Sequence, residues 1–223
     1  MPAEIKLVHL NLQAESLVLG DRIKRQTFRP CIDTLPSSTV AGALAEYSGG
    51  RTILGIGFLR QGSYSRALFV HSPRSQLTGV SVLPLTVECL IPRHGARFIE
   101  GDIYLLHSSD AAALVPHLPL TIHMGALRYK GFGRCTLTLN QLTRCAPGRP
   151  SNPTIPFVRG FFRGRIREPE LAAFGITVVS PRYGYLAEPD PNNPRKVRYR
   201  RAIMEGSLVE APQVFVSEEY RYD

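Results

Sequence analysis

The chain has 223 residues, of which 43% are hydrophobic, and its 27 lysines and arginines outnumber its 18 aspartates and glutamates, for a net charge of +9. This length supplies apolar material for one large domain or two small ones, and no apolar run is long enough to span a bilayer. The basic surplus favours an anionic partner, with nucleic acid first and an anionic membrane surface second.

The compartment is predicted from the N-terminus and the cysteines. The first residues have the pattern of a strand rather than of a signal peptide. The four cysteines are scattered, with no C-x-x-C pair, which is typical of free thiols in a reducing compartment. We therefore expect a cytoplasmic protein with no membrane partner.

The first predicted elements are a strand and a helix. Residues 3–12 alternate between apolar and polar positions, which indicates a strand. After a basic connection at 20–30, the segment 35–47 predicts a short amphipathic helix with serine at its cap position and a Gly-Gly pair at its exit. Two strand-like runs at 52–59 and 67–71 then bracket a connection that we expect to be a protruding hairpin.

The remaining elements complete a recognisable order. Strands are predicted at 80–91 and 97–106, followed by a helix capped by Ser108, a glycine-rich loop and a strand at 134–140. The sequence therefore predicts an α+β, ferredoxin-like βαββαβ domain with insertions over residues 1–141. Residues 142–223, which begin with a breaker-rich connection, are predicted to form a β-rich C-terminal lobe or a second, degenerate ferredoxin-like unit.

The loop at 125–134, Gly-Ala-Leu-Arg-Tyr-Lys-Gly-Phe-Gly-Arg, is the most informative motif. Glycine permits positive φ and close approach of the backbone to a ligand. The three cations suit phosphate, and the two aromatic rings can stack on bases. The spacing matches neither a nucleotide-triphosphate loop nor a dinucleotide fingerprint. Two interpretations stay open on the loop alone: a cradle for single-stranded nucleic acid, and a glycine-rich turn with solvated charges.

Residues suited to catalysis are sparse. The six histidines are spread along the chain without metal-ligand spacing, and no carboxylate pair marks an acid/base site. We therefore expect a binding protein with no metal, no cofactor and no catalytic residue. His123 adjoins the glycine-rich loop, so it is a candidate for contacting RNA or for acting as an acid or base. His94 is a weaker candidate for the same roles. Asp33, ahead of the first helix, has the chemistry to assist RNA cleavage, although acids at helix starts are usually structural.

Basic and aromatic residues in three segments are candidates for RNA binding. In the segment at 157–167, arginines interleave with phenylalanines, and we expect the rings to be partly buried and the cations to face a phosphate backbone. The candidates are Arg22, Lys24 and Arg25 in the first connection, His123, Gly125, Arg128, Tyr129, Lys130, Gly131, Phe132, Gly133 and Arg134 at the loop, and Arg163 and Arg165 in the later segment.

Two of these motifs resemble those of the CRISPR-associated RAMP proteins. The run Leu35–Leu44, Leu-Pro-Ser-Ser-Thr-Val-Ala-Gly-Ala-Leu, is similar to their helix start, and Gly125–Arg134 is similar to their glycine-rich loop. The strand and capped helix that precede the loop fit the same pattern. The resemblance covers roughly residues 3–141. It is closest to the Cas-five group of type III-like effectors, whose members cap the 5′ handle of the guide RNA.

The resemblance implies a non-catalytic subunit that grips the guide RNA handle and anchors an effector complex used in antiviral defence. Its partners would be Cas-seven-like backbone subunits and the large signature subunit. By position, the grip falls on the glycine-rich loop, and the hydroxyl and N–H groups of the helix start add phosphate contacts. The residues at that helix start are Ser37, Ser38 and Thr39.

Three alternatives remain open. A guide-processing endoribonuclease of the Cas-six kind is also built from ferredoxin-like units, but its loop normally lies near the C-terminus and its histidine near the first helix is absent here. A backbone subunit would cut target RNA with Asp33. A basic scaffold would bind protein partners and touch RNA only non-specifically.

Overall fold

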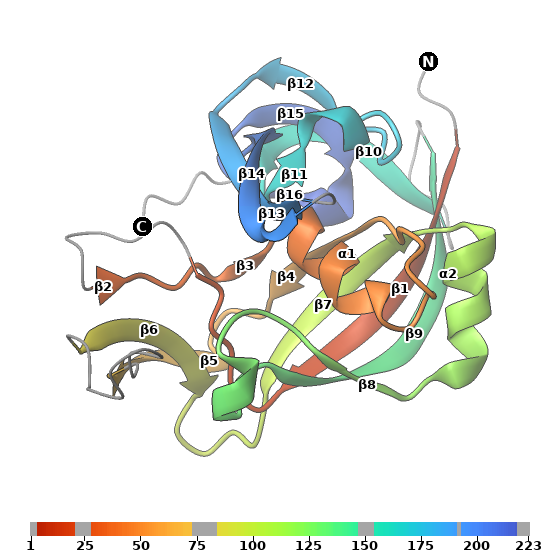
Figure 1. Ribbon diagram of the computed structural model, residues 1–223. Coiled ribbons are helices and arrows are strands. Elements are labelled where there is room, and N and C mark those ends of the chain that lie inside the picture. The colour runs from red at the N-terminus through yellow and green to blue at the C-terminus, as the bar shows by residue number, and fades with distance from the viewer. Residues whose placement is uncertain (1–3, 21–27, 73–83, 147–153, 191–192, 218–223) are drawn as a thin grey trace.

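The computed structural model describes residues 4–20, 28–72, 84–146, 154–190 and 193–217. A curled ten-stranded sheet runs through the molecule, and the C-terminal part contributes several of its strands (Figure 1). One apolar cluster on this sheet includes residues of both α-helices, and a second is formed largely by the C-terminal part. The predicted α+β class is confirmed, with strands predominating. The main path of this sheet, in spatial order, is β12 (Thr177–Ser180), β15 (Leu208–Pro212), β10 (Thr154–Phe162), β9 (Arg134–Ala146), β1 (Ile5–Ala14), β7 (Ile99–Leu106), β4 (Gly55–Leu59) and β3 (Thr34–Leu35), while β8 (Leu120–His123) pairs with β9 and β16 (Val216–Ser217) with β10.

The strand predicted at 3–12 is present as β1, and it lies inside the main sheet, between β7 and β9. It pairs antiparallel with both β7 and β9, and Ala14 at its end lies opposite Ile99 and Cys135. Leu10 packs into the cluster that includes the helices, whereas Leu7 packs into the cluster formed with the C-terminal part. Because both faces are covered, apolar side chains on both sides of the strand leave water.

The two helices follow the predicted positions, and their N-termini differ in how they are capped. Helix α2 (Ser109–Leu114) is capped as expected, since the Ser108 hydroxyl oxygen accepts a hydrogen bond from the Ala111 N–H at 3.1 Å. Helix α1 (Ser37–Ala45) begins after Pro36, and no side chain caps it. The expected serine cap is therefore wrong. The short 3₁₀ turns are η1 (Val115–His117), η2 (Arg128–Lys130), η3 (Glu168–Glu170) and η4 (Gln213–Phe215).

A second, three-stranded sheet contains β2 (Phe28–Arg29), β6 (Leu85–Pro92) and β5 (Tyr64–His71) in that order. The hairpin predicted across residues 60–66 is wrong, because β4 pairs with β3 and β7 while β5 pairs with β6. Burial explains the difference. Every residue of β4 is buried, as suits a strand inside the main sheet, whereas β5 is half-buried or exposed along its length.

The C-terminal part is rich in strands, as predicted. It contains the third sheet of the protein, which consists of β11 (Ile166–Arg167), β14 (Asn193–Ile203) and β13 (Tyr183–Asp190). The division into 1–141 and 142–223 remains a prediction, and its boundary falls within β9. Strand β10 extends the main sheet by pairing in parallel with the end of β9. Phe162, Phe174 and Phe215 then pack on the sheet face opposite the helices.

All four cysteines are buried and free, as expected. Burial raises the pKa of Cys31, Cys135 and Cys145 to about 12, so these thiols are neutral near pH 7 and are not activated nucleophiles. Across the described ranges, the structure has no helix long and apolar enough to cross a bilayer.

Candidate nucleic-acid interface

The glycine-rich loop connects β8 to β9 and is folded tightly onto the chain that follows β1. The Ala126 N–H donates to the Val18 carbonyl at 2.8 Å, and the Gly133 N–H donates to the Ser16 carbonyl at 2.9 Å. The 3₁₀ turn η2 lies in the middle of the loop, between Leu127 and Gly131, both of which have left-handed backbone conformations. The loop is thus a fixed protrusion whose two ends are hydrogen-bonded to the protein.

The glycines of the loop have different physical roles. A Cβ at Gly125 would lie 2.5 Å from the Val18 carbonyl oxygen, and one at Gly133 would lie closer still to the Met124 carbonyl oxygen. Gly131 has φ of +90° but open space around it. The sequence predicts that glycines in this loop let the backbone come close to a ligand. At Gly125 and Gly133 the group that comes close is instead a carbonyl oxygen of the protein itself.

Several backbone N–H groups of the loop are already used inside the chain. Besides the two bonds at its ends, the Lys130 N–H donates to the Leu127 carbonyl and the Gly131 N–H to the Arg128 carbonyl. These four N–H groups are engaged within the protein rather than directed at a phosphate. The exposed side chains of the loop are the groups that can reach an anion.

The three cations of the loop are exposed and only weakly held. Arg128 pairs with Glu46 at 3.1 Å and Arg134 with Glu15 at 3.5 Å, while Lys130 has no carboxylate partner among the described residues. An exposed ion pair contributes only about 0–1 kcal/mol. A phosphate group can therefore replace either carboxylate at small cost.

The two aromatic rings of the loop face different surroundings. Tyr129 is 76% exposed, and the Lys130 amino group lies 5.4 Å from its ring centroid. Phe132 instead packs with Val18 and the β5–β6 strands, and its ring meets that of Phe69 edge-on at 5.1 Å. Tyr129 is thus available for stacking on a base, whereas Phe132 belongs to a small core.

We expect replacement of Phe132 by alanine to lower the free energy of unfolding by about 2 kcal/mol, because it removes a partly buried ring from this core. Chemical denaturation measures the loss. RNA affinity should fall little once the protein is folded. A variant that melts like the native protein but binds RNA much more weakly would contradict the core role.

The other predicted RNA-binding residues lie outside this loop. His123, at the end of β8, is the nearest of them in the sequence; it is exposed and lies opposite Arg134 in the β8–β9 pair. The segment containing Arg22, Lys24 and Arg25 lies outside the described residues. Arg163 is exposed, with its guanidinium 4.9 Å from the Phe58 ring centroid.

Arg165 is placed differently from the exposed position expected of it. Only 14% of its side chain is exposed, and its guanidinium donates twice to the Glu205 carboxylate, at 2.6 and 3.2 Å. This arginine therefore stabilises the C-terminal part through a charge-assisted bond.

At the start of α1, the sequence predicts that hydroxyl and N–H groups contact phosphate. Those of Ser37 are instead bonded to other residues of the protein. The Ser37 hydroxyl is buried and donates to the Glu170 carboxylate at 2.6 Å, and the Ser37 N–H donates to the Arg165 carbonyl at 3.0 Å. A carboxylate thus already occupies the place at the helix start where an anion is favoured. Ser38 and Thr39 are half-buried beside it.

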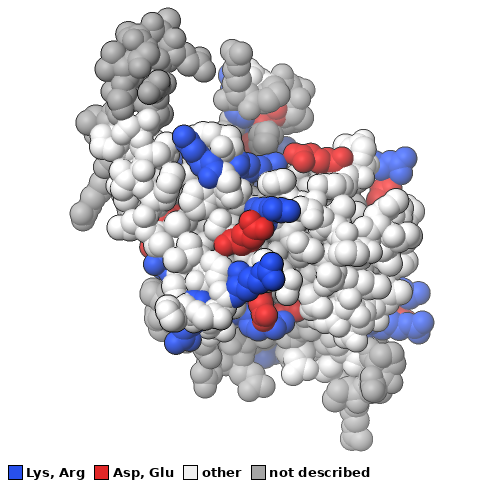
Figure 2. Space-filling model, turned by 90° about the horizontal axis from the view of Figure 1, so that it is seen from below, with Lys and Arg blue, Asp and Glu red and all other residues white. Residues whose placement is uncertain are grey.

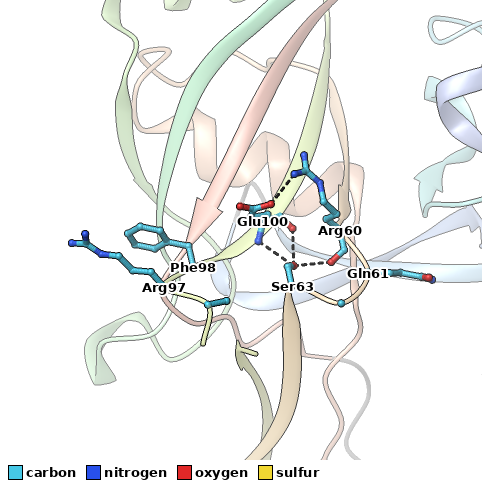
Figure 3. Close-up of a pocket in the computed structure, with 8 residues that line it drawn as sticks. Arg60, Gln61, Ser63, Arg97, Phe98 and Glu100 are labelled. Atoms are coloured by element: carbon cyan, nitrogen blue, oxygen red, sulfur yellow. Dashed lines mark hydrogen bonds and ion pairs between the residues drawn. The ribbon is translucent and has the colours of Figure 1, made fainter. Parts of the chain in front are cut away.

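A shallow pocket lies at the same end of the main sheet as the glycine-rich loop. Its walls are the β4–β5 and β6–β7 connections, with Arg60 and Ser63 on one side and Arg97 and Phe98 on the other (Figure 3). The Arg60 guanidinium pairs with Glu100 at 2.7 Å. Arg97 has no carboxylate partner within the described part of the chain and lies 5.1 Å from the Phe98 ring centroid.

Register places the pocket and the loop close together. Ala14 lies opposite Cys135 on one side and Ile99 on the other, so the starts of β9 and β7 flank the end of β1. The starts of β7 and β9 are therefore two strand spacings apart, which is roughly 10 Å. Figure 2 views the molecule from this end and shows lysines and arginines interleaved with aspartates and glutamates rather than an unbroken basic surface. Sequence reasoning singled out only His94 here, because nothing in the sequence shows that the two connections meet.

Asp33 is part of an ion-pair network. Its carboxylate accepts from the Tyr64 hydroxyl at 3.2 Å and from Arg66 at 3.3 Å, and Arg66 also pairs with Glu88 at 2.9 Å. This arrangement compensates the charge of Asp33 within the protein.

Comparison with solved structures identifies proteins of similar fold. A chain of the Type III-B Cmr-beta bound to cognate target RNA and AMPPnP, state 1, aligns with a TM-score of 0.55 and 10% identity, over 91% of this chain and 86% of that chain. A chain of the Type III-B Cmr-beta bound to cognate target RNA aligns with a TM-score of 0.53 and 11% identity, over the same shares.

The chain shares its fold with these Cmr-beta chains. No family model matches the sequence, and no curated protein matches it. The resemblance to CRISPR-associated RAMP proteins drawn from two short motifs is thus confirmed at the level of the fold. At 10–11% identity the neighbours assign no function to a residue.

Proposed function

We propose that the chain is a non-catalytic, RNA-binding subunit of a CRISPR effector ribonucleoprotein, and that its glycine-rich loop grips the 5′ handle of the guide RNA. The observation that carries the proposal is the exposed set of Arg128, Tyr129, Lys130 and Arg134 on a rigid loop. Cations and an exposed ring on one protrusion fit a single strand, which offers phosphates and unstacked bases.

The architecture supports this assignment. In the main sheet the order β9-β1-β7-β4 is antiparallel throughout, with α1 between β1 and β4 in the chain and α2 between β7 and β9. This is the arrangement expected of a ferredoxin-like βαββαβ unit. The structural neighbours are chains of an RNA-bound Cmr-beta. Cas-seven-like backbone subunits and a large signature subunit are the partners that such a role requires.

RNA binding is tested by titrating the protein with labelled single-stranded repeat RNA at several salt concentrations. Each phosphate contact adds about −0.7 to the slope of log K against log salt. We expect a steep fall in affinity between low and moderate salt. A flat response would remove the electrostatic basis of the proposal.

We expect no specific cleavage when the protein is incubated with repeat or target RNA, with or without magnesium. The Asp33 carboxylate is engaged by Tyr64 and Arg66 rather than poised as a free base. Gel analysis of end-labelled RNA measures the outcome. Cleavage that disappears in Asp33→Ala would establish a target-cutting subunit instead, and cleavage that disappears in His123→Ala would establish a processing enzyme.

A further inference from the structure

The C-terminal part presents an unusual face on the β13–β14 pair. In this antiparallel pair Tyr185 lies opposite Arg201, and Ala187 lies opposite Tyr199. Residues opposite one another share a face of the sheet. Leu186, which points to the other face, is buried. The outer face therefore carries tyrosine rings of β13 together with Tyr199 and Arg201 of β14.

This outer face is aromatic and exposed. Tyr183 is 52% exposed, and Tyr185 and Tyr199 are each 57% exposed. Val197 lies on the same strand as Tyr199 and is also exposed. Clustered large side chains left in water on a folded surface mark a binding site more often than scattered ones do.

One described cation, Arg201, shares the outer face with these rings. Strand β14 carries Lys196, Arg198, Arg200 and Arg201 along its length. The Arg201 guanidinium lies 3.8 Å from the Tyr183 ring centroid, a stacked cation–aromatic arrangement. Arg198 and Arg200 alternate with Tyr199 and Arg201, so they lie on the other face, where they pair with carboxylates of β13. Arg201 pairs with Glu168 at 3.5 Å, an exposed ion pair that a phosphate can replace at small cost. Three exposed rings with an arginine among them suit a partner that has flat aromatic groups and an anionic group beside them.

We propose that this tyrosine face, formed by Tyr183, Tyr185, Tyr199 and Arg201, is a second binding site for single-stranded RNA. Bases stack on the exposed rings, and Arg201 contacts a phosphate. The choice of RNA as ligand rests on the proposed function, but no residue is shared with the glycine-rich loop. In Figure 1 the β13–β14 pair lies above α1, whereas β8, which leads into the loop, lies below it. RNA that reaches both sites would span the helix-bearing side of the molecule.

The test compares Tyr185→Ser/Tyr199→Ser with Tyr185→Phe/Tyr199→Phe in the full chain, using a labelled single-stranded repeat RNA and fluorescence anisotropy. Each ring removed should weaken binding by about fivefold or more, whereas the phenylalanine variant should keep near-native affinity because it keeps the rings. The slope of log K against log salt should stay unchanged, since no cation is lost. Leu68→Ser/Val70→Ser is the matched control, because these β5 side chains are 66% and 59% exposed outside this face.

The possible outcomes are distinct. Native affinity in the serine variant would overturn the tyrosine face and leave the proposed function intact. Unchanged RNA affinity with lost assembly of partner subunits would overturn it in favour of a protein interface. Failure of the native protein to bind any RNA would overturn both proposals. If the serine variant does not fold, ultraviolet cross-linking of the native protein to 4-thiouridine RNA decides. Cross-linked peptides from 183–201 support the proposal, and their absence contradicts it.

Discussion

Replacement of Gly133 by alanine should lower the free energy of unfolding by at least about 3 kcal/mol. Two causes add: a left-handed backbone costs a non-glycine residue about 1–2 kcal/mol, and the new Cβ would collide with the Met124 carbonyl oxygen. That oxygen belongs to the backbone, so it cannot rotate away as a flexible side chain could. The Met124 N–H also bonds to the Gly133 carbonyl at 2.8 Å, which ties both residues together. Chemical denaturation followed by circular dichroism measures the loss.

Gly131→Ala is the matched control for this prediction. Gly131 has φ of +90°, close to the +87° of Gly133, but no atom lies within 4 Å of its Cβ position. Its replacement should therefore cost only about 1–2 kcal/mol, from backbone conformation alone. Equal losses at the two positions would show that the contact with Met124 is not what requires glycine at 133.

The triple variant Arg128→Ala/Lys130→Ala/Arg134→Ala should fold normally and lose most of its affinity for repeat RNA. The three side chains are exposed, and their carboxylate pairs contribute little to stability. If each cation contacts one phosphate, the slope of log K against log salt should become less steep by about 2. Anisotropy titrations at several salt concentrations measure both quantities.

A variant with the same loss of charge elsewhere controls for net charge. Lys6→Ala/Arg51→Ala/Arg144→Ala also removes three exposed cations. Lys6 and Arg144 lie opposite one another in the register of β1 and β9, at the end of the main sheet away from the glycine-rich loop. This variant should keep most of the affinity. If both variants weaken binding equally, RNA responds to overall charge, and the loop has no special part in binding.

Much of the fold could be predicted from local patterns. The strand pattern of β1, the Ser108 cap of α2 and the positive-φ glycines at 125–133 are local properties, and each is present in the structure. The alternation of β1 did not show that both of its faces are covered. The position of β5 could not be predicted, because pairing with β6 rather than β4 depends on contacts between distant strands.

The candidate site was less predictable than the fold, for the same reason. Ser37 and Glu170 are 133 residues apart, and nothing near Ser37 in the sequence indicates that a carboxylate meets it. The pairing of Arg165 with Glu205 is likewise a tertiary contact. Composition identifies basic segments, but only packing decides which cations are exposed. Tyr129 and Phe132 look alike in the sequence, and the structure separates them into an exposed ring and a core ring.

The proposed grip on the guide RNA is tested by purifying the chain with the products of its neighbouring genes, cross-linking the complex with ultraviolet light, and identifying both the RNA and the cross-linked peptides. We expect RNAs that share one repeat-derived 5′ end, with that end cross-linked to residues 125–134. Assembly without RNA would contradict the proposed grip. So would RNA of unrelated sequences, or a 5′ end cross-linked only to other subunits.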